Sequence, residues 1–337
     1  MEVQIFEIAD QFSLGRVENF RRLENGLINE SFQVVTDRGQ FILQKLSPIW
    51  DERVISDYLA VQSYLRTSGV HVPVLLNDRN EKPVYVKEKC LWRAFEYIPH
   101  DLVENPDPEL AFEAGALLGK FHTTMAKNSF NPTFRLPGYR DTPAIVKKLR
   151  VVYSDSIYSD KVKKVLREYA LISNIIESHY LPNNDGKIVI HGDPKFNNFL
   201  FKGGKAIALL DLDTLMMGSP LLDVGDAFRS WCRKKPSTSE FLPEIFNAAL
   251  KGYRSQSCFE IGASEAKNAM SLITLELSAR YLIDYFEESY FPLKPKYSCK
   301  AEQNLARCRR YLEYYRNFTG GVKENHLLAW GLNIAIE

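Results

Sequence analysis

Between residues 191 and 213 the chain carries the side chains that metal-assisted phosphoryl transfer requires. They are Asp193, Asn198, Asp211 and Asp213. One carboxylate can accept a proton from a hydroxyl group, while the others and an amide oxygen hold a hard divalent cation. Each of these residue types is also common in turns, where it serves only the backbone. Their joint occurrence in one short stretch favours the chemical interpretation over four unrelated turn residues.

The surrounding sequence predicts how these side chains are brought together. Short apolar runs at 188–190, 199–201 and 207–210 are typical of buried strands. Gly203 and Gly204 lie between the second and third runs and indicate a hairpin turn, which would place Asn198 near Asp211. Asp211 and Asp213 are two apart on one expected strand, so we predict that they point to the same face. All of these polar side chains could therefore converge.

The composition excludes several classes of function. The 337 residues are 45% hydrophobic, which is ordinary for one two-lobed globular domain or two modest domains. The formal net charge of +1 provides no basic field for nucleic acid. Five cysteines without a C-x-x-C pair predict reduced thiols in a cytoplasmic protein, with neither a disulfide framework nor a zinc site. No secretory signal or membrane-spanning run is visible, so we expect no membrane partner.

The pattern His-x-Asp-x-x-x-x-Asn from His191 to Asn198, followed by the glycine hairpin and Asp-x-Asp, resembles the catalytic segment of the aminoglycoside and choline kinase-like phosphotransferases. The resemblance implies an α+β, two-lobed protein kinase-like fold, with a small β-rich N-terminal lobe and a larger, mostly helical C-terminal lobe. It also implies ATP and Mg²⁺ as cofactors. We expect residues 1–98 to form the nucleotide-binding lobe and residues 99–337 the catalytic and acceptor-binding lobe.

The first 98 residues have patterns that fit a nucleotide-binding lobe. Amphipathic patterns predict helices over 3–14 and 52–67, the second burying Ile55, Leu59 and Leu65, and strands are predicted over 31–35, 41–44, 83–86 and 91–98. Residues 16–24 alternate loosely, and a break at Asn25-Gly26 separates them from the strand predicted at 31–35. Loop amides and the side chains of Asn29 and Ser31 are expected to face the nucleotide phosphates. The last strand leads into a hinge, where the backbone at Glu96 and Ile98 should meet the adenine edge.

The strand at 41–44 is where a kinase places the lysine that pairs with the nucleotide phosphates. Here Gln44 has the expected position and Lys45 follows it. Neighbouring strand residues face opposite sides of a sheet, so the two are not interchangeable. The sequence leaves two alternatives: Gln44 faces the nucleotide, or a bulge turns Lys45 inward.

Helical patterns dominate the rest of the chain. They cover 109–125, 143–152, 158–179, 241–254, 263–288 and 303–317, and the last three are expected to be amphipathic. His122 in the first of these helices is expected to be a packed residue and not a catalyst. The tail at 325–336 is short and apolar enough to dock.

Short motifs spread along the chain narrow the resemblance to N-acetylhexosamine 1-kinases and their relatives. They include Gly26-Leu27-Ile28-Asn29, Phe41-Ile42-Leu43-Gln44, Asp141-Thr142, Gly218-Ser219, Leu275-Glu276, Tyr290-Phe291 and Asn304-Leu305. The resemblance implies that Asp223, in Asp-x-Gly-Asp226, braces the catalytic loop. Two positions depart from the family pattern: Arg140 replaces a histidine, and Tyr311 stands where a glutamine is expected.

The resemblance also assigns roles to single residues. Asp193 would be the base that faces the anomeric hydroxyl of the sugar, with Lys195 near the transferred phosphoryl group. Asn198 and Asp211 would bind Mg²⁺, and Asp213 would hold a second metal or orient the first. The residues expected to contact the acceptor are Asp141, Asp193, Arg229, Arg280, Tyr290 and Arg307.

The expected acceptor lining is mixed in charge. It contains the acids Glu276, Asp284, Glu287 and Glu288 and the bases Arg280, Arg307 and Arg309. This mixture favours a neutral sugar-like acceptor. Two alternatives remain: the same fold acting on an aminoglycoside, choline, a methylthio-sugar or homoserine, and a nucleotide-binding pseudokinase that acts as a scaffold. The chain is expected to be a monomer or a homodimer.

Overall fold

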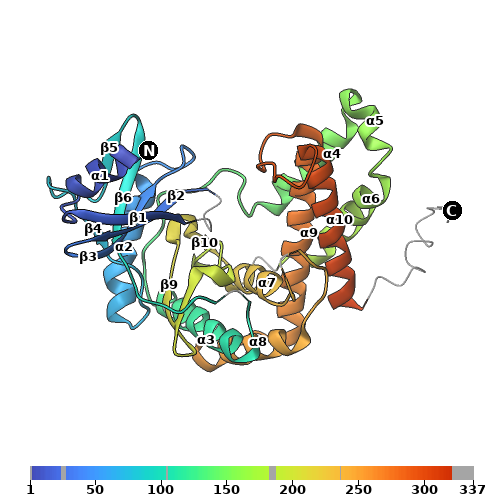
Figure 1. The fold of residues 1–337 in the computed structure, drawn as a ribbon. Helices are drawn as coiled ribbons and strands as arrows, with labels where there is room; N and C mark the ends of the chain where they lie inside the picture. Colours follow the sequence, from blue (N-terminus) through green and yellow to red (C-terminus); the bar gives the residue numbers. More distant parts are fainter. Residues whose placement is uncertain (1, 24–27, 104, 182–186, 236, 321–337) are drawn as a thin grey trace.

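A computed structural model describes residues 2–23, 28–103, 105–181, 187–235 and 237–320 and has the expected two-lobed α+β architecture. Figure 1 shows a small lobe built on a sheet and a larger helical lobe. The expected boundary after residue 98 falls between β6 (Cys90–Glu96) and α3 (Pro108–Met125), and its exact place stays a prediction. The break at Asn25-Gly26, much of the Gly26–Asn29 motif and the docking tail at 325–336 lie outside the described residues.

One antiparallel sheet forms the N-terminal lobe. Its strand order is β1-β2-β3-β6-β4, and β5 pairs with β6. The other strands are β1 (Val17–Leu23), β2 (Glu30–Thr36), β3 (Gly39–Lys45), β4 (Leu75–Leu76) and β5 (Tyr85–Lys87). Helix α1 (Glu2–Gln11) buries Ile5 and Ile8 against Phe32 and Trp92 on one face of this sheet. Because side chains alternate along β6, Phe95 points to the opposite face, where helix α2 packs.

Helix α2 (Arg53–Thr67) corrects one detail of the sequence prediction. Ile55 and Leu65 are buried as predicted, but Leu59 is 38% exposed. Tyr58 lies in the core instead, with its ring centroid 5.3 Å from that of Phe95. The buried stripe follows the helical period through Ile55 and Tyr58, and Leu59 lies one residue beyond it.

Seven helices and four short strands make up the rest of the described C-terminal lobe around α3. The helices are α4 (Thr142–Ser154), α5 (Ser159–Val162), α6 (Leu166–Ile175), α7 (Pro220–Trp231), α8 (Pro243–Gln256), α9 (Ala263–Glu287) and α10 (Lys300–Thr319), and the strands are β7 (Ile188–Ile190), β8 (Phe199–Lys202), β9 (Lys205–Leu209) and β10 (Met216–Gly218). The prediction of one helix over 158–179 was wrong, since this region contains α5, α6 and a 3-10 turn at Ile176–His179. None of the described helices combines the length and apolar character that a membrane-spanning segment needs.

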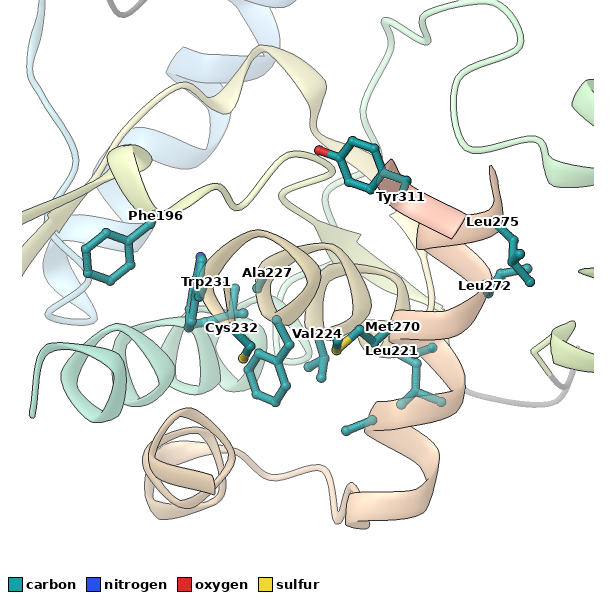
Figure 2. Close-up of a cluster of buried hydrophobic side chains, with 14 of the residues drawn as sticks. Phe196, Leu221, Val224, Ala227, Trp231, Cys232, Met270, Leu272, Leu275 and Tyr311 are labelled. Carbon is teal, nitrogen blue, oxygen red and sulfur yellow. The ribbon is translucent and has the colours of Figure 1, made fainter. Parts of the chain in front are cut away.

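Helix α9 is buried around most of its circumference, contrary to the amphipathic prediction. It packs against α4, α7 and α10, so little of its surface is left for solvent. Figure 2 shows Val224 of α7 lying against Met270 of α9 in this core. At the end of α7, Trp231 reaches toward the catalytic segment: its ring lies 6.1 Å from that of Phe196 and its indole N–H donates to the Pro194 carbonyl at 3.0 Å. The core thereby supports the loop that carries the polar cluster.

Helices α3 and α8 approach each other closely at glycines. A Cβ built on Gly252 of α8 would lie only 1.9 Å from the Phe112 carbonyl oxygen of α3, and one on Gly115 would lie 2.2 Å from the Ala249 carbonyl oxygen. Only glycine permits this contact between backbones. The close approach also brings Tyr253 of α8 against His122 of α3, beside the catalytic loop.

Candidate active site

The loop after β7 is held in place by a buried carboxylate from helix α7. Asp223 accepts hydrogen bonds from the backbone amides of His191 at 2.7 Å and Gly192 at 2.8 Å. Its Oδ2 also lies 3.0 Å from Nε2 of His122, whose other ring nitrogen contacts the Tyr253 hydroxyl. The geometry agrees with the expected bracing role of Asp223. His122 is fully buried in this network, as a packed residue would be.

Asp193, Lys195 and Asn198 lie together in the turn that follows. The carboxylate of Asp193 is 15% exposed and forms a 2.6 Å ion pair with Lys195. The side-chain amide of Asn198 donates to the Asp193 carbonyl oxygen at 2.8 Å, which fixes the turn. Burial lowers the pKa of Lys195, but Asp193 outweighs this effect and the pKa is raised. A cationic lysine thus stands beside the expected base.

Asp211 and Asp213 do not share a strand face, so that prediction was wrong. Strand β9 ends at Leu209, Asp211 adopts a left-handed conformation with φ of 58°, and a 3-10 turn covers Leu212–Thr214. This reversal leaves Asp211 exposed and turns Asp213 inward, where it is 4% exposed. Within the described parts of the chain, no cluster of three or more His, Cys, Asp or Glu side chains is arranged to hold a metal. The four predicted polar groups therefore do not all converge.

Asp211 and Asn198 nevertheless fit a magnesium ion. The Leu210 amide donates to the Asn198 carbonyl at 2.8 Å, so the hairpin brings these residues together as predicted. Asp211 reaches solvent, but the protein around it removes part of the hydration of its carboxylate; this desolvation, and then repulsion by Asp213 and Asp193, raise its pKa to about 6. A carboxylate in this environment gains from a nearby cation. Mg²⁺ commonly uses one or two protein ligands, with water and substrate phosphates completing its octahedron.

Asp213 is bound to the N-terminal lobe by an arginine that the sequence analysis missed. The guanidinium of Arg93, on β6, pairs with the Asp213 carboxylate through two contacts of 2.7 and 2.8 Å, and the two side chains are 2% and 1% exposed. Asn29 donates to the same carboxylate at 2.9 Å. This cluster joins β6 of the N-terminal lobe to the turn that carries Asp213. Asn29 was expected to face phosphates, and in this structure its amide is used by Asp213.

The same cluster decides between Gln44 and Lys45. Gln44 lies directly opposite Arg93 on the neighbouring strand, accepts a hydrogen bond from its Nε at 2.9 Å and donates to the hydroxyl of Ser31 at 2.9 Å. Lys45 is turned to the other side, 3.6 Å from Glu30. The pairing of β3 with β2 and β6 is regular here, so no bulge turns Lys45 inward. Gln44 and Ser31 share the Arg93 side of the sheet, and Lys45 does not.

The connection between the lobes is tied to the β8–β9 turn. The Asp101 amide donates to the Phe201 carbonyl at 2.7 Å, and the Asp101 carboxylate accepts from the Gly203 amide at 2.7 Å. Just before it, the carbonyl of Ile98 lies 2.7 Å from the His100 ring, and the amide of Glu96 is bonded to Val74. Contact of Glu96 and Ile98 with adenine stays a prediction.

Two of the residues expected at the acceptor already have structural partners. Asp141 caps the N-terminus of α4 by accepting from the Ala144 amide at 3.1 Å. Arg229 is 5% exposed and pairs with Asp226 at 2.6 Å. Burial raises the pKa of Asp226, but Arg140 and Arg229 more than offset this and lower it to about 2.

Arg140 stands where the resemblance to N-acetylhexosamine 1-kinases led us to expect a histidine, and it is a second residue whose place the sequence did not predict. Its side chain is 6% exposed and pairs with Asp226 at 2.5 Å and Glu276 at 3.4 Å. It also donates to the carbonyl oxygen of Gly192 at 3.2 Å, directly before Asp193. The departure from the family pattern was the available signal. Arg140 thereby connects α7 and α9 to the catalytic loop.

Arg280, Tyr290 and Arg307 lie together around the ring of Phe291. The guanidinium of Arg280 stacks over the ring of Tyr290 at 5.2 Å and over the ring of Phe291 at 5.9 Å. Arg307 stacks over Phe291 at 6.0 Å and over Tyr281 at 5.4 Å. The predicted acceptor group is thus brought together in part. A separate cavity of about 530 Å³ beside residues 237–240 is lined by Arg309 of the expected acceptor lining, but by none of Arg280, Tyr290 and Arg307.

Comparison with known proteins agrees with this arrangement. The model of the "Phosphotransferase enzyme family" matches residues 19–257. The chain belongs to this family. Among curated proteins it is similar to the homoserine kinase of Neisseria meningitidis serogroup B, with 25% identity covering 74% of this chain and 78% of the relative. It is also similar to the homoserine kinase of Pseudomonas aeruginosa PAO1, with 24% identity covering 78% of this chain and 79% of the relative.

Two solved structures are similar in fold to this protein along nearly the whole chain. The amicoumacin kinase hAmiN, in complex with AMP-PNP, Ca²⁺ and its ligand, superimposes with a TM-score of 0.67 at 20% identity, covering 93% of each chain. A microcompartment-associated aminopropanol kinase gives 0.66 at 18% identity, covering 99% of this chain and all of the other. The protein kinase-like fold is thereby confirmed. The narrower likeness to N-acetylhexosamine kinases stays a prediction.

Proposed function

We propose that this phosphotransferase is an ATP- and Mg²⁺-dependent kinase that phosphorylates a hydroxyl group of a small molecule. The observation that carries the proposal is the braced loop, which presents Asp193 beside Lys195 and Asn198 with Asp211 across the hairpin. Asp193 accepts the proton of the attacking hydroxyl. Lys195 offsets the negative charge that gathers as the phosphoryl group moves. Catalysis is mostly positioning and charge neutralisation, because the transition state of phosphoryl transfer is loose.

Asp211 and Asn198 would hold Mg²⁺, which would neutralise part of the negative charge of the nucleotide phosphates. The resemblance implies that Asp213 binds a second metal ion or orients the first. To bind a metal ion, the Asp213 carboxylate would have to leave its ion pair with Arg93. The positive charge that kinases place on the third strand is absent here, since that position is Gln44. Arg93 stands directly opposite on β6. We assign it as the strand cation nearest the phosphates, oriented by Gln44 and Asp213.

Two acceptor classes have separate support. The motifs at Arg280, Tyr290 and Arg307 resemble those of N-acetylhexosamine 1-kinases, which supports the anomeric hydroxyl of a sugar. The curated relatives named homoserine kinase, each similar over about three quarters of its length, support a hydroxylated amino acid instead. Both acceptors place a hydroxyl at Asp193, so the chemistry is the same.

ADP release with a panel of sugars, amino alcohols, hydroxylated amino acids, aminoglycosides and choline tests the proposal. Asp193→Asn should lower kcat by roughly 10²–10⁴-fold, because a positioned general base contributes about that much. ATP binding should be retained. Asp160→Asn, whose side chain is 97% exposed, is the matched control and should not change turnover. If the wild type turns over no acceptor while binding ATP, the pseudokinase alternative is supported and the enzyme proposal fails.

A further inference from the structure

Two arginines at the expected acceptor side have no acidic partner among the residues that the structure describes. Arg280 of α9 is partly buried and Arg307 of α10 is 9% exposed. Across the described residues, neither guanidinium donates a hydrogen bond or forms an ion pair, and their contacts are with aromatic rings. Among the described residues, no guanidinium nitrogen of Arg280 or Arg307 is fully buried without a hydrogen bond, so these nitrogen atoms still reach solvent.

Such an arrangement removes part of the hydration of two charges, and no described protein group replaces it. Arginine is almost never fully buried without a partner, because its five N–H donors and its charge lose their hydration. Stacking on aromatic rings recovers part of this cost and fixes the plane of the guanidinium. The N–H edges stay free, and these edges match the two oxygens of a carboxylate or a phosphate. Arg280 and Arg307 stack on the same ring, that of Phe291, so they present two such edges to one region.

The acids that appeared to balance these arginines in the sequence are all used elsewhere. Glu276 accepts from Thr142 at 2.6 Å and pairs with Arg140. Glu287 pairs with Lys148 and Glu288 pairs with Lys161, each at 2.8 Å.

Asp284 is enclosed by hydrogen-bond donors in the same way. Burial raises its pKa, but the amides of Tyr290, Phe291 and Ser289 and the side chain of Asn304 offset this, and the pKa is lowered. A carboxylate bonded to four groups has little left to offer a ligand. The lining that looked neutral in the sequence is therefore cationic in the folded protein.

The arginine pair is connected to the catalytic loop through Tyr139. The guanidinium of Arg280 lies 5.7 Å from the centre of the Tyr139 ring. The hydroxyl of Tyr139 donates to the Gly192 carbonyl at 2.9 Å, one residue before Asp193. One tyrosine side chain thus separates Arg280 from the backbone that carries the base. A small acceptor can span this interval.

We propose that the acceptor carries an anionic group, a carboxylate or a phosphate, which Arg280 and Arg307 bind while its hydroxyl faces Asp193. This inference rests on the proposed function and narrows its substrate class. It replaces the neutral acceptor expected from the sequence with an acidic one. A hydroxylated amino acid or a sugar acid fits this description, whereas choline and aminoglycosides, which are cationic, do not.

Matched acceptors test the charge directly. Glucose, glucuronate and glucose 6-phosphate share the anomeric hydroxyl and differ at one end, and homoserine differs from 3-amino-1-propanol only by its carboxylate. ADP release should show a KM at least roughly tenfold lower for a compound that carries the carboxylate or phosphate than for its counterpart without that group, as expected for a charge-assisted bidentate contact. A preference for the phosphate alone would identify a phosphorylated acceptor, and a preference for the carboxylates an acidic one. Equal use of the compounds with and without the anionic group would overturn the inference.

Variants locate the effect. Arg280→Gln and Arg307→Gln should each raise the KM for the anionic acceptor by roughly 10- to 100-fold and leave the KM for ATP unchanged. Arg316→Gln is the control, because Arg316 is on the same helix α10, is exposed and was never expected at the acceptor. Arg280→Lys retains the charge and should recover part of the loss. An unchanged KM in both glutamine variants would also overturn the inference.

Calorimetry separates this inference from the proposed function. Titration of Asp193→Asn with homoserine, glucuronate and glucose 6-phosphate measures anion binding without turnover. If an anionic compound binds this variant but the wild type does not phosphorylate it, the arginine site stands and the kinase proposal is in question. If no anionic compound binds while neutral acceptors are phosphorylated, the kinase stands and the anion site is wrong.

Discussion

Replacement of Arg93 by methionine tests the ion pair that joins the two lobes. The change removes the charge and keeps an unbranched apolar side chain of similar length. Asp213 would then be 1% exposed with Asn29 as its remaining side-chain donor, in place of the two guanidinium contacts at 2.7 and 2.8 Å. Removing one partner of a buried pair typically costs about 3–5 kcal/mol, because the other charge is left desolvated. We expect the free energy of unfolding of Arg93→Met to fall by about that amount.

A second change should recover this loss. In Arg93→Met/Asp213→Asn both charges are gone and the asparagine still accepts from Asn29, so most of the stability should return. Urea denaturation followed by tryptophan fluorescence gives the free energies. Arg53→Met is the matched control, since Arg53 also pairs with an aspartate and stacks on a phenylalanine, but at the surface. Its effect should be a small fraction of that of Arg93→Met.

The double variant also separates stability from nucleotide binding. If Arg93 is the cation nearest the phosphates, the double variant will be stable and still have a raised KM for ATP. A double variant that binds ATP as the wild type does would refute the assignment to phosphates while leaving the lobe contact intact. An Arg93→Met protein as stable as Arg53→Met would refute the reasoning about the buried pair.

Three further predictions concern residues around the site. Burial raises the pKa of Tyr311, but Arg233 and Arg229 more than offset this and lower it to about 8. Because a lowered acid pKa stabilises the folded state once the group is ionised, the stability of the wild type relative to Tyr311→Phe should rise between pH 8 and 10 by up to about 2–3 kcal/mol. If the urea midpoints of the two proteins differ by the same amount at pH 7 and at pH 9.5, the prediction is wrong. Asp223→Asn leaves one of the loop amides without a carboxylate oxygen, so kcat should fall with little change in the KM for ATP, and the reverse pattern in steady-state kinetics would argue against bracing. Gly252→Ala forces a Cβ onto the Phe112 carbonyl and should destabilise the protein by about 1–3 kcal/mol, so an unchanged thermal midpoint would contradict the close approach of α3 and α8.

The parts of the fold that short-range patterns determine could be predicted from the sequence. The hairpin between β8 and β9 followed from Gly203-Gly204, and it brings Asn198 to the segment of Asp211 as expected. The bracing role of Asp223 followed from its motif, and the two amides that it holds agree with it. In each case the relevant residues are close in sequence or belong to one recurring motif.

The features that sequence could not predict depend on partners distant in the chain. The prediction that Asp211 and Asp213 share a strand face was wrong because Asp211 adopts a left-handed backbone conformation. A glycine would have indicated this conformation, but the residue here is an aspartate. Arg93 looked like an ordinary strand residue, since its partner Asp213 is 120 positions away. The helix at 263–288 appeared amphipathic, but its neighbours α4, α7 and α10 cover it from several sides. Tertiary contacts decided these cases, and a single sequence does not display them.

The charges of the cleft suggest how binding and catalysis are related in the proposed kinase. On the nucleotide side, burial and then the carboxylates of Asp213 and Asp193 raise the pKa of Asp211 to about 6, so Lys195 and Arg93 leave part of the negative charge there uncompensated. On the acceptor side, Arg280 and Arg307 lack negative charge. Mg²⁺ with ATP would satisfy the first deficit and an anionic acceptor the second. Each reactant would therefore supply the charge that its own end of the site lacks. A cationic acceptor such as choline would be repelled by the two arginines.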